Sequence, residues 1–219
     1  MIGCILPPEA EWAEMFGDTE EGGLYPEEEA LIRGAVGSRR REFTTARVCA
    51  RRALGRLGVA PAPLLPQGRG APGWPPGVAG SITHCSGYRA CAVVRRGDVL
   101  SLGIDAEPNE AISAGVLAMV ALPHEADQVR ELGARMPGVC WDRLLFSAKE
   151  ALYKAWYPLT GMEISFEHAE VGFEPERGAF GVRMLVAPPP GRSVPPIRGR
   201  YLLTGGLLLT SAVCRTRRG

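Results

Sequence analysis

The N-terminal half of the chain alternates between helical and extended patterns of hydrophobic positions. Two helices are predicted: a short one over residues 26–32 with acidic residues in its first turn, and a longer one from an N-cap at Ser38 through Leu57. Residues 61–77 contain six prolines and four glycines, so they are expected to be irregular. Three short apolar runs bounded by turn residues then predict strands. These strands are 78–84, 89–95 and 99–105.

The C-terminal half begins again with helices and ends in strands. Two helices are predicted across residues 110–132, and a stronger one runs from about Trp141 to Tyr157, where Pro158 is expected to end it. The strands that follow are predicted over 163–173, 179–186 and 197–213, the last with a turn at Gly205-Gly206. This order predicts an α+β fold of two halves, residues 1–104 and residues 105–219.

The composition is that of a globular protein and excludes several classes. Of the 219 residues, 46% are hydrophobic and 22% are charged, which excludes a wholly disordered, collagenous or coiled-coil protein. The six cysteines are scattered without zinc-ligand spacing and indicate a reducing compartment. We find neither a secretory signal nor an apolar stretch long enough to span a membrane. The sequence therefore predicts a cytoplasmic protein that does not bind membranes.

The charges are balanced overall but unevenly distributed. The formal net charge is +1, which argues against a protein that coats nucleic acid. Residues 1–32 carry nine of the 24 acidic residues and no basic one, so the remainder holds all 25 basic residues and only 15 acidic ones. An anionic ligand is therefore expected beyond residue 32. Only two of the basic residues, Lys149 and Lys154, are lysines.

Two carboxylates follow the predicted strand over residues 99–105. Leu100, Leu102 and Ile104 alternate and share one face, so Asp105 and Glu107 would lie together on the other face, roughly 6–7 Å apart. Such a pair is stabilised by a cation, and oxygen ligands without His or Cys favour Mg²⁺. The alternative is a solvated strand end without a metal.

The predicted helix over residues 141–157 carries both lysines. Glu150 and Lys154 are four residues apart on one face, and Lys149 is adjacent to Glu150. An ordinary surface ion pair is one interpretation. In a chain that otherwise uses arginine, a compact lysine charge that approaches a phosphate is the other interpretation.

Further basic groups lie on the predicted helix over residues 38–57 and after it. Arg40, Arg47 and Arg51 repeat at helical spacing on one face, where forked guanidinium groups suit a phosphate. A solvated basic face is the alternative. His84 lies among hydroxyl residues at a strand end, and Arg69 lies in the Gly/Pro segment; each by itself is a weak signal. Together with the carboxylates and lysines, these basic residues indicate a ligand with a diphosphate group that is bound through a metal ion and a further phosphate group that is bound by arginines.

Four motifs resemble those of the 4′-phosphopantetheinyl transferases, and in particular the long, Sfp-type group that includes enzymes like enterobactin synthase component D. The resemblance covers about residues 38–158. The motifs are REFTTARVCARRAL (41–54), GSITHCSGYRA (80–90), GIDAEP (103–108) and FSAKEALYKAW (146–156).

The resemblance implies two similar α+β halves about a pseudo-twofold axis, with coenzyme A bound between them. The implied activity is transfer of 4′-phosphopantetheine from coenzyme A to a serine of an acyl or peptidyl carrier protein, with release of adenosine 3′,5′-bisphosphate. The implied partners are carrier domains of polyketide, nonribosomal peptide or fatty acid synthases, with docking expected on the helices across 110–132. The protein is expected to be a monomer that binds no nucleic acid.

Matching positions assign roles to individual residues. Asp105, Glu107 and Glu150 match the Mg²⁺ carboxylates, with Mn²⁺ as the alternative metal. Glu150 and Lys154 are the expected catalytic residues, Glu150 as the base, directly or through a metal-bound water, and Lys154 at the reacting diphosphate. His84 matches the histidine at the diphosphate, and Arg39, Arg47 and Arg69 match groups around the 3′-phosphate and adenine. Arg40 fits the helical face better than Arg39, so the choice between these two stays open, and Lys149 is expected to give electrostatic support only. The residues expected to bind coenzyme A are Arg39, Arg40, Arg47, Arg69, Ser81, His84, Lys149 and Lys154.

Two other classes of protein would account for part of this set. A Mg²⁺-dependent nucleotide phosphohydrolase would use the same carboxylates, but it would release free products instead of modifying a protein. A nucleic-acid-binding module would use the arginine-rich helix and would not need Asp105 or Glu107.

Overall fold

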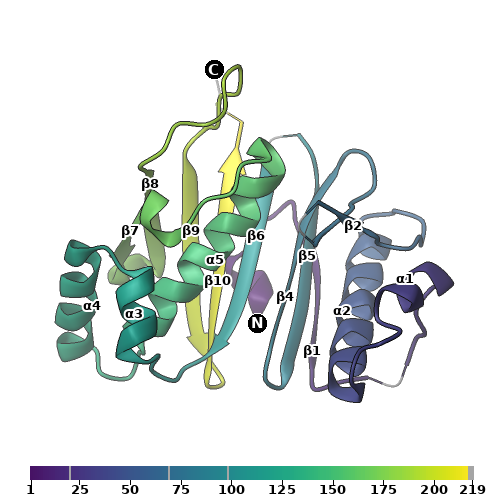
Figure 1. The fold of residues 1–219 in the computed structure, drawn as a ribbon, viewed down its shortest axis with the longest axis horizontal. Coiled ribbons are helices and arrows are strands. Elements are labelled where there is room, and N and C mark those ends of the chain that lie inside the picture. Colours follow the sequence, from purple (N-terminus) through teal and green to yellow (C-terminus); the bar gives the residue numbers. More distant parts are fainter. Residues whose placement is uncertain (20, 69, 98, 217–219) are drawn as a thin grey trace.

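The computed structural model describes residues 1–19, 21–68, 70–97 and 99–216. The described residues form two large antiparallel sheets that lie side by side, with a helix of 20 residues packed on each, and a small two-stranded sheet of β2 and β3 (Figure 1). The α+β fold expected from the sequence is confirmed, whereas the pseudo-twofold axis stays a prediction. Among the described helices, none is long and apolar enough to cross a membrane.

The first sheet has the strand order β1-β5-β4. Helix α2 (Gly37–Arg56) covers it by packing its small residues Cys49, Ala50 and Ala53 against Cys91 and Val93 of the sheet. The strands of this sheet are β1 (Glu11–Phe16), β4 (Val78–Cys85) and β5 (Tyr88–Arg95). The short elements of this part are the 3-10 helix η1 (Ile2–Ile5), helix α1 (Pro26–Leu31), and strands β2 (Pro66–Gln67) and β3 (Ala71–Pro72).

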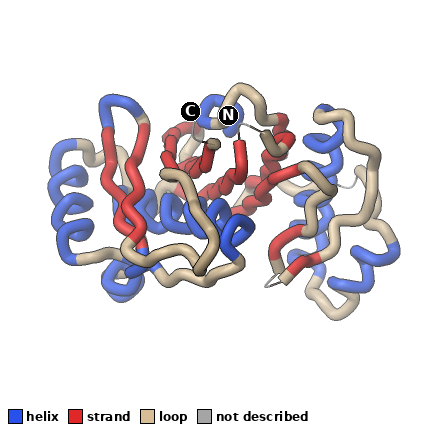
Figure 2. The backbone as a smooth tube through the Cα atoms, turned by 90° about the horizontal axis from the view of Figure 1, so that it is seen from above, coloured by secondary structure: helices blue, strands red, loops and turns tan. Residues whose placement is uncertain are grey.

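The second sheet has the order β6-β10-β9-β8-β7. Helix α5 (Trp141–Thr160) packs along β6 and β10, and Figure 2 shows α5 and η1 on opposite sides of the strands. The strands are β6 (Val99–Pro108), β7 (Ala169–Glu174), β8 (Ala179–Met184), β9 (Ile197–Thr204) and β10 (Leu207–Arg215). The remaining helices are α3 (Ala114–Val120), α4 (Pro123–Arg135), and the 3-10 helices η2 (Phe166–His168) and η3 (Pro175–Arg177).

The structure differs from the expected elements at several points. Helix α5 continues through Pro158 to Thr160, because a proline in the last turn removes only one helical hydrogen bond, and the helix ends where Gly161 adopts a φ of 67°. Val36, not Ser38, is the N-cap of α2. Residues 163–168 contain η2 instead of a strand. Strand β1 was not predicted, because its acidic residues interrupt the apolar pattern.

Strand β6 joins the two parts of the molecule. The expected boundary between residues 104 and 105 falls inside β6, whose residues on both sides of it pair with β10. Toward the first sheet, β6 meets β4 without a shared backbone ladder. Instead, the amide of Ile104 donates to Ser81 Oγ at 3.0 Å, and the amide of Ala106 donates to Thr83 Oγ1 at 3.0 Å. These two hydroxyl groups satisfy buried amide groups at the edge of a sheet, which would otherwise lack a partner.

Both faces of β6 are buried around Asp105. The strand is therefore not the solvated strand end that the sequence left open as an alternative. Leu102 and Ile104 face the core that η1 covers, and the alternate residues face α5. Gly103 lets the helix approach, because a Cβ atom there would lie 2.0 Å from the backbone oxygen of Ala151. This close contact places α5 directly against the strand that carries Asp105.

The acidic N-terminal segment neutralises much of the arginine-rich helix α2. Glu28 is fully buried, and its carboxylate accepts hydrogen bonds from Arg51 at 2.9 Å and from the amide of Leu64 at 3.0 Å. Arg47 Nε lies 3.6 Å from the same carboxylate. On the surface, Glu29 pairs with Arg40. The acidic N-terminal segment therefore supplies counter-charges for the arginine side chains of α2.

We expect Glu28→Gln to lower the free energy of unfolding by about 3–5 kcal/mol, because it leaves Arg47 and Arg51 without a buried counter-charge. The matched control is Glu29→Gln, which breaks the exposed pair with Arg40 and should cost at most about 1 kcal/mol. Urea denaturation of the two variants measures the difference. Equal losses of stability would contradict the proposed importance of the buried carboxylate.

Candidate active site

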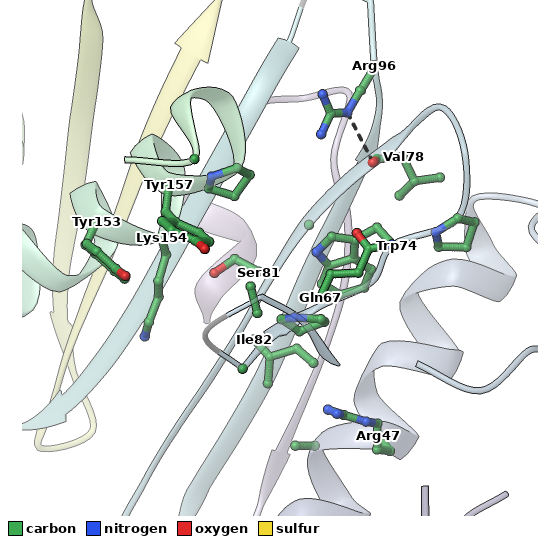
Figure 3. Close-up of a pocket in the computed structure, with 18 of the residues that line it drawn as sticks. Arg47, Gln67, Trp74, Val78, Ser81, Ile82, Arg96, Tyr153, Lys154 and Tyr157 are labelled. Atoms are coloured by element: carbon green, nitrogen blue, oxygen red, sulfur yellow. Dashed lines mark hydrogen bonds between the residues drawn. The ribbon is translucent and has the colours of Figure 1, made fainter. Parts of the chain in front are cut away.

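A cavity of about 830 Å³ lies where the two sheets meet. Its walls come from α2, β4 and α5, and Figure 3 shows Lys154 and Tyr157 of α5 on one side with Arg47 and Trp74 on the other. Trp74 lies flat against β4, because Gly80 has no side chain and a Cβ there would come within 2.7 Å of the indole. The cavity therefore combines an aromatic wall with basic groups from both parts of the chain.

Lys154 and Asp105 form the centre of the α5 side. Lys154 Nζ donates to Asp105 Oδ1 at 2.6 Å and to the backbone oxygen of Ile104 at 3.2 Å. Asp105 is 5% exposed, and it also accepts hydrogen bonds from the hydroxyl groups of Thr83 at 3.2 Å and Ser147 at 2.8 Å. The structure thus brings together two residues that the sequence placed in separate motifs.

The two other predicted metal-binding carboxylates lie nearby. Burial raises the pKa of Glu107, and the negative charge of Asp105 raises it further, although Arg143 opposes this with a hydrogen bond of 2.9 Å. Burial likewise raises the pKa of Glu150, where Lys154 opposes the shift and Asp105 and Glu107 add to it. The three carboxylates are close enough to repel one another, so a cation between them would be stabilising.

The donor chemistry of these carboxylates fits a hard divalent cation, but they do not form a ready-made metal cluster. Within the described residues, no group of three or more His, Cys, Asp or Glu side chains is arranged to hold a metal ion. Asp105 is engaged by Lys154 and Glu107 by Arg143. A metal would therefore have to replace these internal cations at the carboxylate oxygens.

The α2 side of the cavity presents Arg39, Arg47 and His84. Arg39 Nη1 donates to Glu42 at 2.7 Å, and His84 Nδ1 lies 2.9 Å from the same carboxylate. The guanidinium of Arg47 lies over the ring of Phe43, with 4.1 Å between Cζ and the ring centroid. Burial lowers the pKa of Arg47 and also that of His84. These three basic side chains line one continuous wall.

Three other predicted ligand-binding residues have different positions. Arg40 does not line the cavity and pairs with Glu29, so the choice between Arg39 and Arg40 falls on Arg39 by position. Ser81 lines the cavity, but its oxygen accepts the amide hydrogen of Ile104. Arg69 lies outside the described residues.

Lys149 does not line the cavity that contains Lys154; it lines a smaller neighbouring cavity, and its expected electrostatic support of the ligand stays a prediction. Its ammonium group donates to Glu125 at 2.7 Å and to the backbone oxygens of Val120 and Phe166, both at 2.9 Å. Burial lowers its pKa, and the Glu125 carboxylate opposes that shift. Lys149 thus links α5 to the junction of α3 and α4 as a buried structural cation.

Sequence interpretation missed several residues that shape the site. Thr83 and Ser147 orient Asp105, and Glu42 joins Arg39 to His84. A hydroxyl residue inside an otherwise apolar run, as at Thr83 and Ser147, was an available signal. Glu42 is harder to identify, because only Arg39 lies on its own helix, three residues away, and its contacts with His84 and Arg89 come from strands β4 and β5.

A second cavity of about 500 Å³ adjoins the first at α5. Glu150 and Tyr153 line both cavities, and Phe166 and Ile164 form apolar parts of the second. Glu150 therefore lies at the point where a basic cavity meets a more apolar one.

Basic residues line one wall of the cavity, and Lys154 and Glu150 line the other with Asp105 behind the lysine, a combination typical of sites that bind phosphorylated ligands. Family comparison identifies the class. Residues 27–94 match the model of the 4′-phosphopantetheinyl transferase N-terminal domain, and residues 101–187 match that of the 4′-phosphopantetheinyl transferase superfamily.

Similar proteins carry the same designation. The chain is 52% identical to 4′-phosphopantetheinyl transferase Svp of Streptomyces mobaraensis, over 96% of this chain and 88% of Svp. It is 43% identical to PptT of Mycobacterium tuberculosis, over 97% of each chain. It is also 43% identical to Npt of Nocardia iowensis, over 96% of this chain and 98% of Npt. The chain belongs to the 4′-phosphopantetheinyl transferase family, and it is an enzyme of that class.

The burial of Lys149 can be tested by its effect on stability. We expect Lys149→Met to lower the free energy of unfolding by about 3–5 kcal/mol, because Glu125 would keep an uncompensated buried charge. The double variant Lys149→Met/Glu125→Gln should recover part of this loss. Chemical denaturation measures both. Wild-type stability combined with weakened coenzyme A binding would instead support the ligand-binding role expected from the sequence.

Proposed function

We propose that this enzyme transfers the 4′-phosphopantetheine group from coenzyme A to a serine of an acyl or peptidyl carrier protein. Adenosine 3′,5′-bisphosphate is the second product, and the reaction depends on Mg²⁺. The observation that carries this proposal is the single cavity bordered both by Arg39, Arg47 and His84 and by Glu150 and Lys154. A ligand that fills it would have phosphate groups at two separated places, as coenzyme A does.

The two adjoining cavities support one orientation of bound coenzyme A. The basic cavity would hold the 3′-phosphorylated nucleotide, with Trp74 along its wall. The pantetheine arm would extend past Glu150 and Tyr153 into the second cavity. The diphosphate would then lie beside Lys154, at the junction of the two cavities.

In the reaction, the carrier serine oxygen forms a bond to the phosphorus nearest pantetheine, and the bond from that phosphorus to the bridging oxygen breaks. Lys154 is the chain's own cation at this position and would offset the charge that develops on the leaving bisphosphate. Glu150 would accept the serine proton.

Asp105, Glu107 and Glu150 would hold the Mg²⁺, or Mn²⁺ in its place. When bound, the metal would neutralise charge on the diphosphate oxygens. Burial raises the pKa values of Glu107 and Glu150, and the charge of Asp105 raises them further; a cation among the three carboxylates would relieve this repulsion, which supports the assignment. Lys154 would then be released from Asp105 and become available to the diphosphate.

The proposed partners are carrier domains of polyketide, nonribosomal peptide or fatty acid synthases, and the enzyme would act as a cytoplasmic monomer. Helices α3 and α4 are the proposed docking region. Met119 on α3 is 70% exposed, which supports an apolar contact there.

The direct test is to incubate the enzyme with coenzyme A, Mg²⁺ and an apo carrier protein and to measure the mass of the carrier. We expect a gain of one phosphopantetheine, which is lost when EDTA is added and strongly reduced in Asp105→Asn. Release of free phosphopantetheine with an unmodified carrier would indicate a phosphohydrolase instead. A carrier modified equally well in EDTA would refute the metal assignment.

Lys154→Arg tests the need for a compact cation. The larger guanidinium cannot take the place of the ammonium 2.6 Å from Asp105 without displacing its neighbours, so we expect kcat to fall on the order of a hundredfold although the charge is retained. Arg177→Lys, which alters only an exposed pair with Glu174 away from the cavities and from α3 and α4, is the control. Steady-state kinetics with a carrier protein measure both, and a near wild-type kcat for Lys154→Arg would contradict the role.

A further inference from the structure

The face of α5 that lies against β6 carries two cations that pair with carboxylates of the strand. Arg143 Nη1 donates to Glu107 Oε2 at 2.9 Å, and Lys154 Nζ donates to Asp105 Oδ1 at 2.6 Å. Ser147, between the two cations, donates to Asp105 Oδ2 at 2.8 Å. The three α5 residues are spaced four and seven positions apart, which keeps them on one side of the helix. Each of the two β6 carboxylates proposed to hold the metal therefore has its own cation on α5.

The two cations differ in whether a bound donor can reach them. Lys154 lines the main cavity, where the diphosphate would replace Asp105 as its partner. Arg143 lines neither the main nor the second cavity. Bound coenzyme A therefore offers Lys154 a new partner but offers none to Arg143.

Arg143 is also held in place by a backbone group. Its Nε donates to the backbone oxygen of Glu110 at 2.9 Å, in the segment that follows β6. The same segment is joined to the first turn of α5, where the amide of Ile112 donates to Asp142 Oδ2 at 2.9 Å. The side chains of Arg143 and Glu107 are 23% and 19% exposed, so water can replace little of their contact. Breaking this pair therefore carries a free-energy penalty.

A metal ion at Glu107 has to overcome this penalty. Arg143 occupies one oxygen of the carboxylate and repels a divalent cation placed beside it. Sites that bind Mg²⁺ commonly combine one or two carboxylates with oxygens of a substrate phosphate. The diphosphate of coenzyme A would supply such oxygens, and its negative charge would offset the repulsion. Metal binding is therefore expected to be weak in the empty enzyme and tighter when coenzyme A is present.

We propose that Arg143 is a positioning residue that competes with the metal ion for Glu107, so that the metal binds tightly only together with coenzyme A. This inference rests on the proposed function and adds a residue that controls its metal site. Arg143 touches neither the donor nor the reacting atoms. It acts through Glu107, whose carboxylate would otherwise be free to bind the metal before the donor arrives.

The test measures the Kd for Mn²⁺ by electron paramagnetic resonance, without carrier protein and with or without coenzyme A. Without coenzyme A, Arg143→Met should bind Mn²⁺ about 10- to 100-fold more tightly than wild type, because no charge-assisted hydrogen bond has to be broken. Arg143→Lys retains the charge and should stay closer to wild type. Coenzyme A should lower the Kd of wild type. Arg143→Gln, which also removes the charge, replaces Arg143→Met if that variant does not fold.

Two further variants separate the proposed competition from a general effect of charge. The double variant Glu107→Gln/Arg143→Met should lose the gain in affinity, because Arg143 acts through Glu107. Arg177→Met is the matched control, since it removes one positive charge from an exposed pair with Glu174 and should leave the Kd within about twofold. Thermal unfolding of each variant identifies those that fold.

A folded Arg143→Met that binds Mn²⁺ no more tightly than wild type overturns the inference. A gain that survives in the double variant overturns it as well, and so does wild-type binding that coenzyme A does not tighten. The mass of the carrier protein tests the proposed function separately. If wild type leaves the carrier unmodified, the proposed function fails; if it modifies the carrier and the Mn²⁺ result is negative, only the role of Arg143 fails.

Discussion

The site depends on two sheets that meet through side-chain hydroxyl groups instead of a backbone ladder. Ser81 and Thr83 of β4 accept the amide hydrogens of Ile104 and Ala106 of β6. Inserted side chains hold two strands farther apart than the about 4.8 Å of a continuous sheet. The cavity lies at this junction, and the Thr83 hydroxyl also donates to Asp105. The same contacts therefore join the two parts of the chain and position the reacting groups.

Carboxylates behind the cavity explain how a chain of net charge +1 presents several cations to one ligand. Glu28 lies behind Arg47, Glu42 holds Arg39 and His84, and Asp105 holds Lys154. Each pairing keeps a basic group in place at low electrostatic cost when no anion is bound. A phosphate group that enters the cavity would therefore replace these carboxylates as the partner of the basic side chains. It would not have to neutralise an exposed cluster of like charges.

Most helices and strands followed from periodicity, and the exceptions have local physical causes. The apolar stripe of α5 predicted the helix, but Pro158 in its last turn could be accommodated and did not end it. The acidic residues of β1 concealed a strand whose Glu14 accepts a hydrogen bond from Tyr88 of the neighbouring strand. Of the site, the motifs identified Asp105, Glu107, Glu150 and Lys154. Glu42 lies within the first motif, but its contacts with His84 and Arg89 could not be predicted, since these partners are 42 and 47 positions away in the chain.

The two lysines show most clearly what each level decides. The sequence by itself determined that both lie on one helix five positions apart, and therefore about 140° apart around its axis. They therefore face different surroundings, and periodicity alone does not say which lysine faces the main cavity, although the family resemblance favoured Lys154. The tertiary structure decided this when Gly103 allowed β6 to approach α5, which placed Asp105 beside Lys154 and left Lys149 to the buried Glu125. The choice follows from packing between segments distant in sequence, which local pattern does not encode.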